Sequence, residues 1–142
     1  MNLRLPLPLR RALLAAMCVL GSQAFAAEYT ASTLEEFQAA WNQMANGDTL
    51  NITGSIDFEG IELSALPADA AIVLKSDGHG KISNFNYKDM SAVEMQDLNV
   101  DGEGTVRVGS MTEGMLSGRS DAGNTLSIED GSTLDGTWLV LE

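Results

Sequence analysis

The sequence predicts an all-β protein of the solenoid class, a right-handed single-stranded parallel β-helix with one α-helix capping its amino end. Three observations predict it: short apolar segments recur at a nearly constant spacing, a helical pattern precedes the first of them, and turn residues separate the short β-type runs. A spacing of roughly 20 to 30 residues is typical of a solenoid, because one turn cannot bury its apolar face without neighbouring turns.

The recurrence is clearest in four apolar segments, whose central residues are separated by 22, 21 and 22 positions: Leu50, Ile72, Val93 and Met115. We predict that these four residues lie above one another in successive turns. A β-sandwich is the competing all-β architecture, but it would join neighbouring strands through tight hairpin turns. The regular spacing and the preceding helix favour the parallel β-helix.

Residues 1–26 have the features of a cleaved signal peptide. Three arginines and no acidic residue give this segment a positive charge, and its apolar stretch, residues 12–21, is too short to span a membrane. Small residues precede the expected cleavage point, which we place between Ala26 and Ala27. An uncleaved anchor helix is the alternative, and cleavage is favoured. The protein is therefore expected to be exported.

Removal of the signal peptide leaves a strongly acidic chain of 116 residues. It carries 5 Lys and Arg against 20 Asp and Glu, a net charge of −15. Such a surface repels nucleic acid and anionic lipid, and it suits a soluble exported protein. No membrane span is expected in the mature chain. The only cysteine, Cys18, leaves with the signal peptide, so stability must come from a continuous core or from neighbouring chains.

Residues 27–47 are predicted to form a short lead-in and the capping helix. The helix is expected to begin at Ser32 or Thr33, because Thr33 and Glu36 match the capping box, and to end at Asn46 and Gly47. Apolar residues at i, i+3, i+7 and i+10 predict a buried face, and a helix that covers the end of a core is favoured over a partner-binding helix. These residues are Leu34, Phe37, Trp41 and Met44.

Residues 48–142 are predicted to form the turns of the β-helix. The β-type runs are three to six residues long, and Gly, Asp, Asn and Ser stand between them, as expected at sharp corners. One longer insertion, residues 62–70, contains Pro67. The place of residues 109–124 in a turn is open, because they carry few large apolar side chains.

Two stretches resemble a known group of proteins. In the first, a helix is followed by Gly47-Asp48-Thr49-Leu50-Asn51-Ile52, which resembles the opening of exported parallel β-helix proteins of the pectin-lyase-like kind. In the second, residues 125–136, an alternating apolar run precedes Gly131-Ser132, which resembles the turns of autotransporter passenger domains. The resemblance implies a passenger-like stem on the bacterial surface, often adhesive. An autotransporter also has a membrane β-barrel, so we expect either the front piece of a longer protein or a chain that seals its last turn by association.

The sequence predicts no catalytic site and no cofactor-binding site. Asp97, Asn99 and Asp101 are calcium candidates, because oxygen ligands at alternate positions resemble the first half of an EF-hand loop. Val108 stands at the twelfth position, where that loop requires a glutamate. The pattern therefore favours a half-buried strand with these three polar side chains on its wet face and no bound ion.

Two further residues, His79 and Arg107, have side chains that take part in catalysis or metal binding in other proteins. His79 is the sole histidine and stands between two glycines, which favours a turn residue over a metal ligand or a catalytic base. Arg107, with Asp97 and Asp101, is the one arrangement reminiscent of a β-helix polysaccharide lyase, but acidic residues are so frequent here that such proximity is expected by chance.

The predicted function is an exported, non-catalytic, passenger-like β-helix segment at the bacterial cell surface, acting as a stem or an adhesin. The alternatives are a fragment of a β-helix polysaccharide lyase or hydrolase, and a small periplasmic structural protein that stacks end to end. Expected partners are glycans or proteins of a host or cell surface, and further copies of the chain. The outer membrane surface or the exterior is the expected location, with the periplasm as the alternative.

Overall fold

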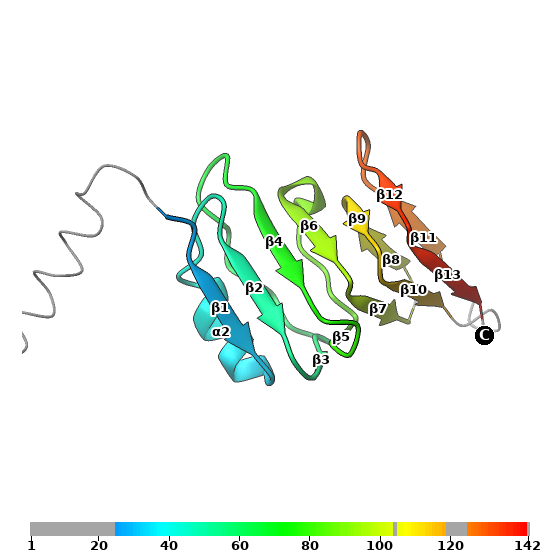
Figure 1. Ribbon diagram of the computed structural model, residues 1–142, viewed down its shortest axis with the longest axis horizontal. Helices are drawn as coiled ribbons and strands as arrows, with labels where there is room; N and C mark the ends of the chain where they lie inside the picture. The colour runs from blue at the N-terminus through cyan, green and yellow to red at the C-terminus, as the bar shows by residue number, and fades with distance from the viewer. Residues whose placement is uncertain (1–24, 104, 119–124, 142) are drawn as a thin grey trace, which may run out of the picture.

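The structure is a computed structural model that describes residues 25–103, 105–118 and 125–141, and these residues form a parallel β-solenoid (Figure 1). All pairings among the described strands are parallel, which confirms the predicted fold class and excludes the β-sandwich. The predicted signal peptide lies outside the described residues, apart from Phe25 and Ala26.

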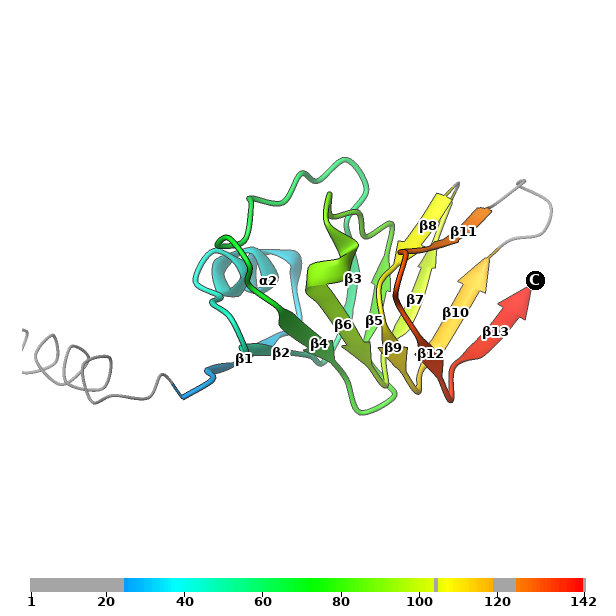
Figure 2. The ribbon, with the colours of Figure 1, turned by 90° about the horizontal axis from the view of Figure 1, so that it is seen from above.

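Three parallel sheets form the walls of the solenoid (Figure 2). The chain alternates between the six-stranded and the five-stranded sheet, and it visits the two-stranded sheet only in the later turns. The six-stranded sheet has the order β1 (Glu28–Ala31), β2 (Thr49–Ile52), β4 (Ile72–Lys75), β6 (Val93–Gln96), β9 (Met111–Thr112), β12 (Leu134–Asp135). The five-stranded sheet contains β3 (Ser55–Asp57), β5 (Lys81–Ser83), β7 (Asn99–Gly102), β10 (Met115–Gly118) and β13 (Trp138–Leu141). The two-stranded sheet pairs β8 (Thr105–Val108) with β11 (Thr125–Ile128).

The register confirms the predicted stacking in the middle of the chain and corrects it at both ends. Ile72 pairs with Val93, as predicted. Leu50 pairs with Leu74 and not with Ile72, because the insertion before β4 lengthens that turn. A shift of two residues keeps the same face inward, since side chains alternate along a strand.

The prediction for Met115 was wrong. Met115 belongs to β10 in the five-stranded sheet, where it pairs with Asn99, and Met111 occupies the place above Met95. This turn takes a shorter path, because it lacks the long connections of the earlier turns. The segment 109–124, whose place was open, thus supplies β9 and β10 in two different sheets.

The capping helix is present but shorter than predicted. Helix α2 (Leu34–Trp41) begins after Thr33, whose hydroxyl accepts a hydrogen bond from the Glu36 backbone N–H at 3.2 Å. The Glu36 carboxylate reaches back to the backbone N–H of Ser32 at 2.7 Å, one residue before the expected partner. The helix ends at Trp41, so the positive-φ Gly47 belongs to the loop that follows and not to the helix end.

Buried apolar side chains from all three sheets fill the interior as stacked columns. Phe37 and Trp41 of α2 are almost fully buried, as the helical stripe predicts, and they meet the rings of Phe58 and Phe85 at centroid distances between 4.6 and 6.1 Å. Aromatic rings at these distances and in edge-to-face orientations pack favourably. The helix therefore closes the amino end of the core, at the end where β1 lies (Figures 1 and 2).

The insertion before β4 is fixed to the body by the polar tips of two aromatic residues. The Trp41 indole Nε1–H donates to the Ser64 carbonyl at 2.8 Å, and the Tyr87 hydroxyl accepts from the Leu66 N–H at 2.9 Å. Both aromatic residues are buried, so these bonds also satisfy their polar atoms. The insertion has no regular secondary structure and forms one rim of a surface groove described below.

Candidate functional site

A groove runs beside the insertion on the flank of the solenoid. One part, of about 530 Å³, is lined by Gly60, Ile61, Glu62, Leu63, Asn86, Tyr87, Lys88 and Arg107. The adjoining part, of about 610 Å³, shares Gly60, Ile61 and Asn86 and adds Asp57, Phe58, Glu59, Asn84 and Glu103. The shared residues make the two parts one continuous, open groove with a mixed polar lining.

Hydrogen bonds order the acidic end of this groove. The Asp57 carboxylate accepts from the Asn84 side-chain amide at 2.9 Å and from the Glu59 backbone N–H at 3.0 Å. These two bonds, the Asn84 bond foremost, lower the pKa of Asp57 below its ordinary value. Asn84 also accepts from the Glu103 backbone N–H at 2.9 Å, so its amide is held on both sides. The result is a fixed carboxylate and amide facing solvent.

Arg107 lies at the other end of the groove and is held by its own partners. Its guanidinium donates to Glu129 at 3.2 Å and to the Tyr87 carbonyl at 3.4 Å. Asp101, by contrast, pairs with Lys81 at 2.8 Å on the neighbouring strand β5. The contacts among the described residues therefore give Arg107 and Asp101 separate ion pairs and do not join Arg107 to Asp97.

The three calcium candidates lie on and before β7, with partly exposed side chains. Asp97 and Asn99 line one hollow of about 380 Å³ that also contains Glu113 and Trp138. The Asn99 amide donates to the Gly78 carbonyl at 3.2 Å, and Asp101 engages Lys81 through Oδ2. Among the described residues, no group of three or more acidic, histidine or cysteine side chains is placed to hold a metal ion.

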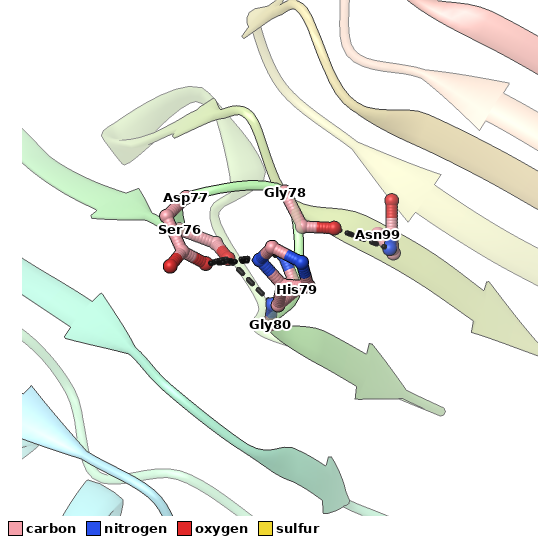
Figure 3. Close-up of polar contacts among 6 residues, drawn as sticks. All are labelled: Ser76, Asp77, Gly78, His79, Gly80 and Asn99. Carbon is pink, nitrogen blue, oxygen red and sulfur yellow. Dashed lines mark hydrogen bonds and ion pairs between the residues drawn. The ribbon is translucent and has the colours of Figure 1, made fainter.

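His79 lies in an exposed corner between β4 and β5, as the flanking glycines predict (Figure 3). Its Nδ1 is 3.2 Å from Asp77 Oδ1, and the same oxygen accepts from the His79 backbone N–H at 3.1 Å. These two bonds, the backbone bond foremost, lower the pKa of Asp77. Ser76 Oγ accepts from the Gly80 N–H at 2.6 Å, so the hydroxyl closes the turn and does not face the imidazole. The arrangement is a stabilised turn.

Glycine is required at the end of this corner. A Cβ on Gly80 would lie 2.2 Å from the Ile52 carbonyl oxygen and 2.6 Å from Ser76 Oγ. No real side chain tolerates such approaches, so the preceding turn and the corner pack without space for a methyl group. The corner thus fixes the spacing of successive turns at this edge of the solenoid.

The carboxyl end of the solenoid exposes apolar side chains that continue the inward columns. Leu139 pairs with the buried Leu116, yet it is 60% exposed. Leu126 and Ile128 pair with the buried Val106 and Val108 and are 40% and 45% exposed. These side chains are in register with buried core residues of the preceding turn. In the described structure, no further turn packs over them. We refer to Leu126, Ile128 and Leu139 as the open end.

Sequence reasoning missed three features of these sites. It did not single out Tyr87 or Asn84 as groove residues, because their roles depend on the path of an irregular insertion. It also did not single out Asp48, which is only 5% exposed and is the one charged residue buried among the described residues. Its position directly before a strand and after Asn46-Gly47 is a turn signal, but it gives no sign of burial.

Comparison with protein-family models, with curated proteins and with solved structures finds no match for this chain. The resemblance to autotransporter passengers therefore remains a prediction from the sequence pattern. Within the described residues, no helix combines the length and the apolar character needed to cross a membrane.

Proposed function

We propose that this chain is an exported, non-catalytic β-solenoid segment at the bacterial cell surface, serving as a stem with an adhesive flank. The observation that supports it best is the parallel register. Residues one turn apart lie directly beside one another, so outward side chains form rows with a repeat of about 4.8 Å. One such row contains Thr30, Asn51, Lys75, Gln96, Thr112 and Asp135.

Such rows suit weak contacts repeated along an extended partner. A polysaccharide or a protein strand has a regular repeat of polar groups. Once one contact has formed, its neighbours form at a high effective concentration, so many weak contacts give a high overall avidity. The groove beside the insertion supplies fixed carboxylate and amide oxygens, with Lys88 and Arg107 at its far end. Hydroxyl-rich glycans are the partner class that this mixed, open lining suits best.

The adhesive role is tested with the full chain on an array of immobilised glycans. We expect binding that falls at least several-fold in Asn86→Ala and Lys88→Ala, which change exposed groove residues. Lys81→Ala is the matched control, because it removes the same charge from a residue that lies outside both the groove and the row of outward side chains described above. Binding that is unchanged in both groove variants would contradict the proposed use of this groove.

Surface location is tested separately on cells that express the full chain with its leader. A protease added to intact cells is expected to degrade the chain, whereas a periplasmic marker protein survives. Protection of the chain until the outer membrane is opened would favour the periplasmic alternative.

The enzyme alternative is tested by incubating the full chain with polygalacturonate. We expect no unsaturated products and no new reducing ends. Product formation that depends on Asp97 or Arg107 would replace the adhesive proposal with a lyase or hydrolase.

A second role, end-to-end association of copies, is favoured by the open end. The side chains of the open end stand in register with buried core residues, and the backbone of the strands that carry them is free to pair on one edge in the described structure. A further β-solenoid turn would cover both the side chains and the strand edges. The molar mass of the full chain in solution tests this role. A stable monomer at high concentration would count against it.

A further inference from the structure

The buried carboxylate of Asp48 lies where the chain enters the solenoid. Its Oδ1 accepts from the Ala27 backbone nitrogen at 2.7 Å, and its Oδ2 accepts from the Ala45 N–H at 2.8 Å. The Asp48 carboxylate thus has two neutral backbone N–H groups as partners. No ion pair to Asp48 is found among the described residues. A buried carboxylate without a cation is costly, so such a site normally contains a positive partner.

Among the described residues, Ala27 is also the first one that hydrogen-bonds to the body of the solenoid. Its carbonyl accepts from the Thr49 N–H at 2.9 Å, and the pairing of β1 with β2 continues from Glu28. Phe25 is 89% exposed and Ala26 is exposed, so the two residues before Ala27 lie outside the body. The cleavage point expected from small residues in the sequence therefore lies directly before the strand pairing that begins the described solenoid.

We propose that cleavage after Ala26 creates the cation that Asp48 lacks: the new α-ammonium group of Ala27 forms a partly buried ion pair with the Asp48 carboxylate. This inference rests on the proposed export of the chain. Hydrolysis of the Ala26–Ala27 peptide bond by water gives a carboxylate on the leader and an amine on Ala27, which takes up a proton. The nitrogen already lies at hydrogen-bond distance from Oδ1, so no rearrangement of the backbone is required.

The consequence is that processing and folding stability are coupled. In the precursor the Ala27 nitrogen is a neutral amide, and in the processed chain it is a charged donor to the same oxygen. The amide N–H already donates to a carboxylate oxygen, and the ammonium group adds the attraction between two opposite charges to the same contact. Removal of the leader should therefore stabilise the first turn as well as release the protein.

The test is a double-mutant cycle on exported product made from the full gene. One partner is changed by Asp48→Asn. The other is changed by inserting one alanine between residues 26 and 27, so that cleavage after Ala26 leaves the ammonium one residue away and Ala27 as an amide. Intact mass identifies the first residue of all four products, and urea unfolding gives their stabilities.

We expect Ala27 as the first residue of the unmodified product. We expect Asp48→Asn to change its unfolding equilibrium constant at least about tenfold more than in the product with the extra alanine. Equal effects in both products would show that Asp48 only holds backbone N–H groups, and would overturn the proposal. A first residue other than Ala27 would overturn it as well.

Two further arrangements keep the test decisive. If the Asp48→Asn products do not fold, the two Asp48 products are compared directly, and equal unfolding midpoints overturn the ion pair. If the host retains the chain without exporting it, the proposed export fails. The same four chains are then released from a fusion by a protease that leaves the desired first residue, and the cycle is evaluated as before.

Discussion

The two ends of the solenoid differ in how their last core layer is covered. At the amino end, α2 places Phe37 and Trp41 over the interior, where they are 0% and 2% exposed. At the carboxyl end, the open end continues the same inward columns, but Leu139 is 60% exposed. Large apolar side chains stand at both ends, so exposure is set by whether another element packs over the turn. A solenoid therefore needs a cap or a neighbour at each end.

The comparison is tested most strongly by Phe37→Ala. Phe37 contacts the rings of Trp41, Phe58 and Phe85, and its removal leaves a cavity that the stacked turns cannot collapse. We expect a loss of about 3–5 kcal/mol in the free energy of unfolding, measured by urea denaturation.

The control for Phe37→Ala is Leu126→Ala at the open end. A loss of less than about 1 kcal/mol is expected, because this side chain is already partly solvated. Similar losses in the two variants would mean that the two ends do not differ in the way described.

Gly109→Ala tests how closely the middle turns pack. An added Cβ would lie 2.1 Å from the Met90 carbonyl oxygen and 2.7 Å from that of Val93, so backbone must move. We expect a loss of about 1–3 kcal/mol, seen as a lower urea midpoint. Gly131→Ala, where a Cβ meets open space but φ is +80°, isolates the cost of backbone conformation. Close packing is contradicted if Gly109→Ala costs less than Gly131→Ala.

Glu36→Gln tests the cap at the closed end through its pH dependence. The backbone and hydroxyl hydrogen bonds of Ser32 lower the pKa of Glu36 in the folded state. A depressed folded-state pKa contributes stability above the unfolded value, near 4.5, that is lost as pH falls through the lower folded value. We expect Glu36→Gln to lose less stability than the parent chain between about pH 5 and pH 3.

Thermal unfolding across this range measures the effect. Glu35→Gln is the matched control, because it changes the same charge in the same helical turn and leaves the cap in place. An identical acid dependence of Glu36→Gln and the parent chain would contradict a contribution of this cap.

Trp138→Lys has the smallest expected effect on folding. Trp138 is 73% exposed, so we expect a change within about 0.5 kcal/mol in the free energy of unfolding. Any self-association through the open end should weaken, because a charge is added beside the exposed strand edge. Light scattering measures it, and Thr30→Lys on β1, the edge strand at the closed end, is the control. If the two variants associate equally, the chain does not associate through the open end.

The sequence predicted the stacking of Ile72 on Val93, because the intervening turn has no insertion and its apolar spacing is a true repeat. It failed for Leu50 and Met115, because the length of a turn depends on its corners and loops as well as its strands. Corner residues such as Asp97 and Asn84 adopt positive φ of 49° and 57° without being glycine, so the chain turns where no glycine marks the bend. The groove could not be predicted, since it forms only where an irregular insertion meets later turns.

By itself the sequence determined the class of fold, the capping helix and the acidic character of the chain, because these follow from local periodicity, capping residues and composition. Only the tertiary structure decided which residues lie beside one another one turn apart, which apolar side chains remain uncovered, and that Asp48 is buried against Ala27. Those properties depend on register between segments about 20 residues apart, and a change of one turn length alters register without altering any local pattern.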